Sequence, residues 1–165
     1  MNRAFTVLID SREKKPLPLP AHIVVGREEG SGTQTVAVRS IICPLKTGDY
    51  VLQGHETGTI VERKGSLMEV VKNVRGRDRK RFLAALDRVA EEAARPVLFL
   101  EGTPSDLARA EHRDPTLRGG LDELMRVCAQ RNVHFLLLPA RTPGNRRSAA
   151  EFILRMLIAG ATHGW

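Results

Sequence analysis

Short apolar runs of β-favouring residues recur along this chain, and in its second half they alternate with amphipathic helical segments. The runs VLFLE and VHFLLL each follow a segment in which apolar residues recur at helical spacing. Strand and helix units that follow one another in this way are typical of sheets that contain parallel strands. The pattern therefore predicts an α/β domain with a central mixed β-sheet flanked by helices.

The first half of the chain holds most of the expected strands, separated by loops rich in Pro, Gly and polar residues. We expect strands at residues 4–9, 22–26, 35–43, 50–52 and 59–61. The connection at residues 27–34 contains Gly and Ser but no apolar anchor, so we expect a mobile hairpin tip there. Gly54 and Gly58 lie between the last two runs, which predicts that these runs form a β-hairpin.

After Gly65 the apolar period changes from that of a strand to that of a helix. Ser66, followed three residues later by Glu69, forms a capping-box pattern at the start of this segment. Helices are expected at residues 66–74, 78–95, 105–112, 121–131 and 147–159, and strands at residues 97–101 and 133–138. A length of 165 residues suits one domain with a substantial core.

Acidic residues stand at the ends of expected strands, namely Asp10, Asp49 and Glu62. The hairpin would bring Asp49 and Glu62 together, and Asp10 would lie at the same edge of the sheet. Carboxylates held close together repel each other unless a cation lies between them. Mg²⁺ prefers oxygen ligands and keeps several waters, so the two hairpin acids, the backbone carbonyl of Arg63 and waters would supply its shell.

Lys64 shares a strand face with Glu62, because strand side chains alternate with period two. Its ammonium group can therefore approach a metal-bound water and a phosphate oxygen, which suits hydrolysis of a phosphodiester. The alternative is that Asp49 caps a turn and that the residues from Glu62 to Lys64 form a charged strand end on a solvated surface. Spacing alone leaves both interpretations open.

GDY followed by ERK, with IDSRE upstream, resembles the nuclease domain of the XPF family of structure-specific DNA endonucleases. That family has the pattern G-D-x(n)-E-R-K-x-x-x-D within a restriction-endonuclease-like fold, and RFLAALDRVAEEAARPVLFLEG resembles the helix and strand that follow its ERK. The residues to which the resemblance assigns roles are the catalytic Asp10, Asp49, Glu62 and Lys64, and the supporting Arg12 and Arg63. It implies that Asp49 and Glu62 bind Mg²⁺ or Mn²⁺.

The last acid of that pattern has no direct counterpart, because Met68 stands at its position and Glu69 follows. The apolar pair after the family's acid matches Val70 and Val71, which suggests a one-residue insertion in the turn and makes Glu69 the substitute acid. The alternative is that Glu69 serves only as the capping-box partner of Ser66. Both interpretations stay open.

The chain carries 26 Lys and Arg against 19 Asp and Glu, a net charge of +7 that favours a polyanionic partner. The segment VRGRDRKR at the start of a helix is the expected phosphate clamp, with residues Arg75, Arg77, Arg79, Lys80 and Arg81. A second basic cluster, which would extend this DNA-binding track, consists of Arg141, Arg146 and Arg147. Aromatic residues make up only 4% of the chain, so recognition is expected to rest on backbone charge and DNA shape.

The resemblance implies a metal-dependent DNA endonuclease that acts on branched, flap or otherwise structured DNA in repair, recombination or replication. We expect residues 1–165 to form a single nuclease domain without a helix-hairpin-helix or helicase module. Nuclease domains of the family pair, so a homodimer or heterodimer through this domain is expected. The alternative is a catalytically inactive DNA-binding or scaffolding subunit, although the sequence retains Asp49, Glu62 and Lys64.

The sequence gives no sign of a membrane or secretory destination. It has no run of about 18 apolar residues to span a bilayer, and its first ten residues lack the features of a secretory signal. Cys43 and Cys128 lie far apart, each within an apolar segment, which favours two buried thiols in a reducing compartment over a disulfide or a metal clip. We therefore expect an intracellular protein without membrane association.

Overall fold

A computed structural model describes residues 4–26 and 32–162 of the chain, so residues 27–31 of the expected hairpin tip lie outside the described part. The strands are β1 (Ala4–Asp10), β2 (His22–Gly26), β3 (Thr33–Cys43), β4 (Tyr50–Leu52), β5 (Thr59–Lys64), β6 (Arg95–Glu101) and β7 (His134–Leu138). The helices are α1 (Leu67–Arg75), α2 (Arg79–Glu92), α3 (Pro104–Arg113), α4 (Pro115–Gln130) and α5 (Pro143–Thr162). None of these helices is long and apolar enough to cross a membrane.

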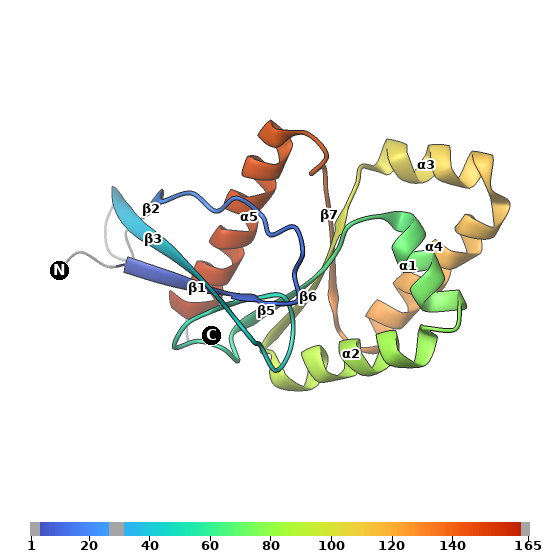
Figure 1. Cartoon of the computed structure of the whole chain (residues 1–165), viewed down its shortest axis with the longest axis horizontal. Helices are drawn as coiled ribbons and strands as arrows, with labels where there is room; N and C mark the ends of the chain where they lie inside the picture. Colours follow the sequence, from blue (N-terminus) through green and yellow to red (C-terminus); the bar gives the residue numbers. More distant parts are fainter. Residues whose placement is uncertain (1–3, 27–31, 163–165) are drawn as a thin grey trace.

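The described strands form one sheet in the order β2-β3-β1-β4-β5-β6-β7. β1 is parallel to β3, and β6 is parallel to both β5 and β7. The pairs β2 with β3, β1 with β4 and β4 with β5 are antiparallel. The parallel pairing of β5, β6 and β7 follows from their connections, since α1 and α2 join β5 to β6, and α3 and α4 join β6 to β7. The predicted central mixed sheet flanked by helices is confirmed (Figure 1).

Side-chain alternation along β6 divides the core into two layers. Val97 and Phe99 pack in the cluster that contains the apolar side chains of α5. Leu98 and Leu100 point to the opposite face and pack with α1, α2 and α4. All four side chains are 0% exposed, as expected for a strand that is covered on both faces. The two helical layers on either side of the sheet are visible in Figure 1.

The C-terminal end of α2 differs from the predicted one. The helix ends at Glu92 rather than at residue 95, because the Ala94 N–H donates to the Thr57 carbonyl at 2.8 Å and starts the pairing of β6. Pro96 also disfavours a helical conformation in the residue before it. The chain therefore leaves the helix and pairs with the sheet before the amphipathic pattern ends.

The start of α4 differs as well, because the helix begins at Pro115 rather than at residue 121. Gly119 and Gly120 oppose helix formation by propensity. In the fold they lie where α4 approaches α1 closely, and a β-carbon at Gly120 would lie 2.7 Å from Val71 Cγ2. Tertiary packing between the two helices thus overrides the local preference of the two glycines.

Gly48 shapes the turn that delivers Asp49 to the sheet. Its φ of 74° lies in the left-handed region, and a β-carbon there would lie 2.4 Å from Ile60 Cγ2. The Asp49 N–H donates to the Val61 carbonyl at 2.8 Å, and the Asp49 carbonyl accepts from the Asp10 N–H at 2.9 Å. Backbone hydrogen bonds therefore fix Asp49 between β1 and β5.

Gly48→Ala is expected to lower the free energy of unfolding by about 2–4 kcal/mol, because a left-handed Ala costs about 1–2 kcal/mol and overpacking against Ile60 adds to it. The corresponding fall in Tm is roughly 5–15 °C, measured by circular dichroism. Gly54 offers a matched control, since its φ is 81° but a β-carbon there meets nothing within 4 Å. Gly54→Ala should cost only the backbone part, and equal losses at both positions would contradict the packing argument.

Candidate active site

A cleft of about 690 Å³ lies beside the end of β5, between the loop that follows β1 and helices α1 and α2. Asp49, Glu62 and Lys64 line it together. Its basic lining residues are Arg12, Lys14, Lys15, Lys46, Arg81 and Arg88, in addition to Lys64 and Arg63. The structure therefore brings the two hairpin acids and Lys64 into one concave site whose lining contains more basic than acidic residues.

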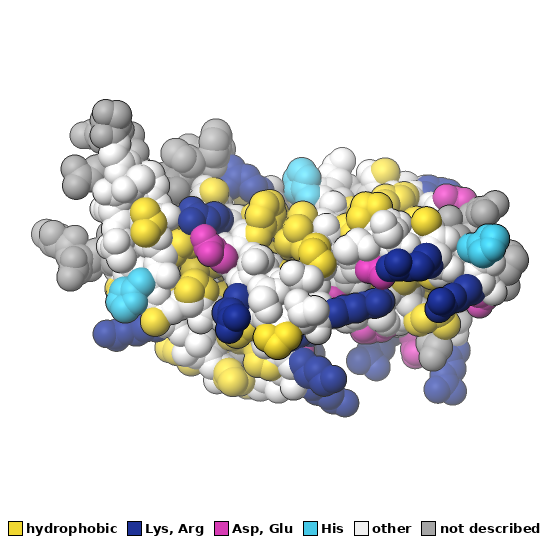
Figure 2. Space-filling model, turned by 90° about the horizontal axis from the view of Figure 1, so that it is seen from above, with side chains coloured by type: hydrophobic (Ala, Val, Ile, Leu, Met, Phe, Trp, Pro, Cys, Tyr) yellow, Lys and Arg dark blue, Asp and Glu magenta, His cyan; other side chains and the backbone are white. Residues whose placement is uncertain are grey.

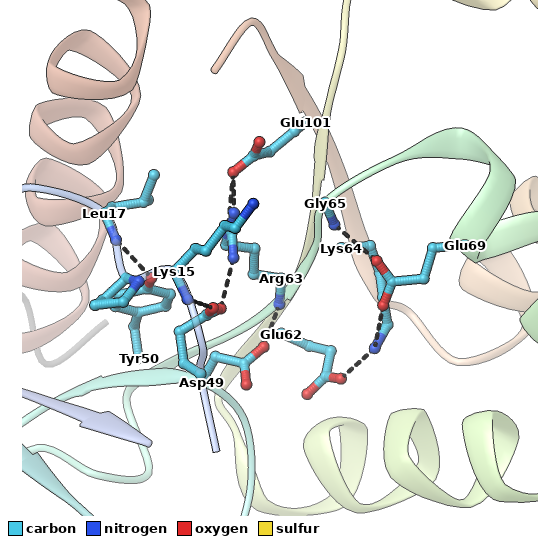
Figure 3. Close-up of polar contacts among 12 residues, drawn as sticks. Lys15, Leu17, Asp49, Tyr50, Glu62, Arg63, Lys64, Gly65, Glu69 and Glu101 are labelled. Carbon is cyan, nitrogen blue, oxygen red and sulfur yellow. Dashed lines mark hydrogen bonds and ion pairs between the residues drawn. The ribbon is translucent and has the colours of Figure 1, made fainter. Parts of the chain in front are cut away.

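Asp49 and Glu62 are acids held close enough to influence each other. The Asp49 Oδ2 atom accepts the backbone N–H of Arg63 at 2.6 Å (Figure 3). Burial, followed by the charge of Glu62, raises the pKa of Asp49 to about 7, although the hydrogen bond from Arg63 acts in the opposite direction. The Glu62 side chain is only 13% exposed. A cation bound between the two acids would relieve this repulsion.

The side chains present fit a hydrated divalent cation. Among the described residues, no three His, Cys, Asp or Glu side chains gather into a metal site of side chains alone. Asp49 and Glu62 supply two carboxylates, and the Arg63 carbonyl is turned to the same side of β5 as the Arg63 N–H that contacts Asp49. Mg²⁺ is commonly bound by one or two carboxylates and keeps several waters, and Mn²⁺ shares its preference for oxygen ligands. The chemistry of this donor set suits either ion.

Lys64 is held beside Glu62 within the cleft (Figure 3). Its Nζ atom lies 2.9 Å from Glu62 Oε1, 3.9 Å from Glu69 Oε1 and 5.7 Å from the centre of the Phe82 ring. Burial disfavours the charge, but the Glu62 carboxylate outweighs it and raises the pKa of Lys64 above its usual value. Lys64 is therefore protonated at neutral pH and can donate hydrogen bonds to a phosphate oxygen or a water.

Asp10 lies at the end of β1, and its carboxylate is engaged by Arg12. It accepts hydrogen bonds from the Arg12 backbone N–H at 2.8 Å and from Arg12 Nε at 2.9 and 3.0 Å. Burial works against ionisation, but the hydrogen bonds from Arg12 outweigh it and lower the pKa of Asp10. Asp10 is 1% exposed whereas the Arg12 side chain is 73% exposed. Asp10 thus holds Arg12 at the rim of the cleft, and a direct catalytic role for Asp10 stays a prediction.

Glu69 combines a helix-capping contact with a contact to Lys64. Its N–H donates to Ser66 Oγ at 3.2 Å, as a capping box requires, and its Oε2 accepts the N–H of Gly65 at 3.0 Å. Its Oε1 atom approaches the Lys64 ammonium, and its side chain lines the cleft. Both roles considered for Glu69 are therefore compatible with its position, whereas the neighbouring Met68 is 46% exposed.

The basic residues predicted to form a phosphate clamp do not gather at the cleft. Arg81 lines it. Arg79 instead lies 2.7 Å from a carboxylate of α4, and Arg75 lies against the same helix. Arg77 and Lys80 are exposed. The start of α2 thus contributes Arg81 to the cleft, whereas Arg79 points toward α4.

The residues of the second predicted basic cluster also point to different parts of the fold. Arg146 donates to the backbone carbonyls of Lys15 and Pro16, each at 2.9 Å. Arg141 lies 3.4 Å from a carboxylate oxygen of Asp106 on α3, and Arg147 is exposed. Arg146 therefore holds the loop after β1 and does not contribute to an open basic surface.

Basic residues that sequence analysis missed also line the cleft, namely Lys14, Lys15, Lys46 and Arg88. A signal was available for three of them, because Lys14 and Lys15 directly follow IDSRE and Lys46 precedes GD by two residues. Recognising it requires knowing that the loop after β1 and the turn before β4 border one cleft. Elsewhere, Lys and Arg side chains are also spread over the face drawn in Figure 2.

Arg63 contributes to the site through its backbone, while its side chain lies apart from Glu62 and Lys64. Neighbouring strand residues point to opposite faces, so Arg63 faces the side of the sheet that α5 covers. There its guanidinium pairs with Glu13 and Glu101. These two ion pairs fix the Arg63 side chain, and the expected supporting role of Arg63 in the site stays a prediction.

The family model described as the ERCC4 domain matches residues 9–156. A solved structure of XPF from Aeropyrum pernix matches with a TM-score of 0.63 and 17% identity over 96% of this chain. Another, described as XPF from Aeropyrum pernix in complex with DNA, matches with a TM-score of 0.59 and 19% identity over 94% of this chain. In both cases this chain spans 66% of the Aeropyrum pernix chain, just under two thirds of its length. No curated protein sequence gives a significant match.

Proposed function

The chain belongs to the ERCC4-domain family, and from that premise we propose that it is a divalent-metal-dependent endonuclease that hydrolyses phosphodiester bonds in structured DNA. The observation that carries the proposal is the half-buried acidic pair, Asp49 and Glu62, beside a protonated Lys64 in one basic cleft. Acids placed so that their charges raise a pKa occur preferentially at functional sites. A purely scaffolding subunit has no need of such an arrangement.

The proposed mechanism assigns a separate task to each residue. Mg²⁺ or Mn²⁺, held by Asp49 and Glu62, would supply Lewis acidity at the phosphate and a more acidic bound water. Lys64 donates a hydrogen bond to a non-bridging phosphate oxygen and offsets the negative charge that develops in the transition state. The Arg63 N–H keeps the Asp49 carboxylate oriented, and Arg12 at the rim holds the adjacent phosphate.

The DNA backbone would run along the cleft between two basic walls. Lys14, Lys15 and Lys46 form one wall, and Arg81 and Arg88 of α2 form the other. Contacts to phosphates fix the position of the strand but read no sequence. We therefore propose recognition by the course of the backbone, as at a branch or flap, with an affinity that falls as salt rises.

The proposal is tested by cleavage of labelled single-stranded, duplex, flap and fork DNAs with Mg²⁺ or Mn²⁺ at one salt concentration. We expect cleavage that requires the metal, stops with EDTA and favours the branched substrates over plain duplex. Binding of DNA without cleavage in either metal would instead favour the inactive scaffolding subunit. Failure to bind any of the four DNAs would exclude both functions.

We also propose that the domain pairs with a second nuclease domain through the β7 edge and α5. β7 is the last strand of the sheet, its residues from Phe135 to Leu138 are only half-buried, and Phe152 on α5 is 46% exposed. An unpaired strand edge with apolar side chains readily pairs with another chain. Light scattering should therefore give twice the mass of the chain, and Phe152→Glu should halve it. A monomeric wild type would contradict the homodimer and leave the heterodimer.

Glu69→Gln is expected to slow cleavage about three- to fivefold and to leave Tm within about 2 °C. The amide preserves the capping contacts with Gly65 and Ser66 but removes the charge near Lys64, and a partly exposed ion pair contributes up to about 1 kcal/mol. Asp106→Asn is the matched control, because Asp106 occupies the equivalent capping position in α3. Unchanged turnover in Glu69→Gln, measured under single-turnover conditions, would show that capping is the only role of Glu69.

A further inference from the structure

Arg63 lies at the centre of a buried ion-pair network that the proposed chemistry does not use. Its Nη1 atom donates to Glu13 Oε2 at 2.7 Å. Its Nε atom donates to Glu101 Oε1 at 2.7 Å (Figure 3). Its Nη2 atom contacts Glu101 as well. All three side chains are 8% exposed. Such a network orders the segments that contribute to it, because removal of one partner leaves a buried charge uncompensated.

Arg146 extends the network to the start of α5. Its Nη1 atom lies 3.5 Å from Glu101 Oε1, and its Nη2 atom bonds to two backbone carbonyls of the loop after β1. The network thus contains two cations and two carboxylates and is electrically balanced. It joins β5, β6, α5 and that loop at one place.

The segment at residues 11–19, here called the β1 loop, contains neither helix nor strand and is held by specific contacts. Glu13 binds Arg63 with one carboxylate oxygen and accepts the Lys15 N–H at 2.8 Å with the other. The Leu17 N–H donates to the buried hydroxyl of Tyr50 at 3.0 Å. The loop therefore presents its lysines to the cleft from a backbone that is fixed at several points.

We propose that Glu13 is a positioning residue that, through Arg63, holds the β1 loop as a preformed basic wall for DNA. This inference rests on the proposed function. Ordering a free loop costs conformational entropy at every residue, so a loop that is already fixed binds phosphate more tightly than a mobile one. Loss of the Glu13 carboxylate should therefore weaken DNA binding through Lys14 and Lys15 and leave the chemical step nearly unchanged.

A loss of stability alone would not distinguish this role from a structural one, so the test is a double-mutant cycle. The variants are Glu13→Gln, the pair Lys14→Ala with Lys15→Ala, and the combination of all three. Fluorescence anisotropy gives the Kd for a labelled flap DNA, and single-turnover cleavage gives the rate at saturating protein. Glu151→Gln is the control, because Glu151 forms an exposed ion pair with Arg155 along α5.

We expect Glu13→Gln to raise Kd about tenfold, to change the saturating rate less than threefold, and to add nothing once both lysines are replaced. In the DNA-free protein, the amides of Lys15 and Leu17 should exchange hydrogen faster in this variant. Additive effects on Kd, a large fall in the saturating rate or unchanged exchange would each overturn the inference.

Two further results separate this inference from the proposed function. If wild type binds DNA but cuts none, the nuclease proposal fails while Kd and hydrogen exchange still decide the role of Glu13. If wild type binds no DNA, both fail. Should Glu13→Gln not fold, Arg146→Ala releases the β1 loop from the α5 side and is expected to give the same pattern.

Discussion

Replacing Asp49 with Asn is expected to lower the rate of DNA cleavage by about a thousandfold or more. Asn still accepts the hydrogen bond from the Arg63 N–H but removes one of the two charges that we propose hold the cation. A bound metal supplies several kcal/mol of transition-state stabilisation, and each 1.36 kcal/mol corresponds to about tenfold in rate. Rates are measured in single turnovers at saturating protein, so that weaker DNA binding does not contribute.

The same substitution is expected to stabilise the metal-free protein at alkaline pH. Burial and the charge of Glu62 raise the pKa of Asp49 from its ordinary 3.8 to about 7, so the folded state holds the proton more tightly than the unfolded chain. The stability linked to this proton is fully present below pH 4 and is lost as the pH rises through 7. At pH 8 without metal, the Tm of Asp49→Asn should therefore exceed that of wild type. Saturating Mg²⁺ should raise the Tm of wild type by several degrees and that of the variant far less.

Asp106→Asn is the control for Asp49→Asn, because it removes the charge of an acid that lies outside the cleft, at the start of α3. Asp106 caps α3 and pairs with the exposed Arg109. Its replacement should leave the cleavage rate and the response of Tm to Mg²⁺ unchanged. Cleavage by Asp49→Asn within tenfold of wild type, or an equal rise in its Tm with Mg²⁺, would contradict the role assigned to Asp49.

The meeting of Asp49, Glu62 and Lys64 could be predicted because it depends on local patterns. Two-residue alternation places Glu62 and Lys64 on one strand face, and their charged groups lie 2.9 Å apart in the structure. Gly54 and Gly58, with the short apolar runs on either side of them, predicted the hairpin that brings Asp49 alongside. The switch to helical spacing after Gly65 marked the end of β5 in the same way.

Contacts between distant segments could not be predicted from such patterns. Arg63 pairs with Glu13 and Glu101, which are 50 and 38 residues away, and no period links these positions. Arg79 pairs with Glu123, 44 residues away, although its place at the start of a basic helix suggested a phosphate contact. A basic residue that faces DNA and one that faces another helix occupy the same kind of local position, and only the packing of α1, α2 and α4 separates them.

Replacing Lys64 with Ala is expected to slow cleavage at saturating metal about 100- to 1,000-fold, the usual effect of removing one donor to developing charge. The same change should lower the metal concentration that gives half the maximal rate. The reason is that the Lys64 ammonium lies 2.9 Å from Glu62 and competes with the cation for that carboxylate. A slower reaction with tighter metal binding is therefore the signature of a residue that acts on the phosphate.

Lys64→Arg tests whether charge alone is sufficient. Arg keeps the positive charge beside Glu62, but its planar fork presents its donors differently from a compact ammonium group. We expect metal affinity close to that of wild type and a rate between those of wild type and Lys64→Ala, both measured by titrating Mg²⁺ in single-turnover cleavage. If Lys64→Ala instead required more metal and regained the full rate at saturation, Lys64 would act only by orienting Glu62, and its proposed contact with the phosphate would be wrong.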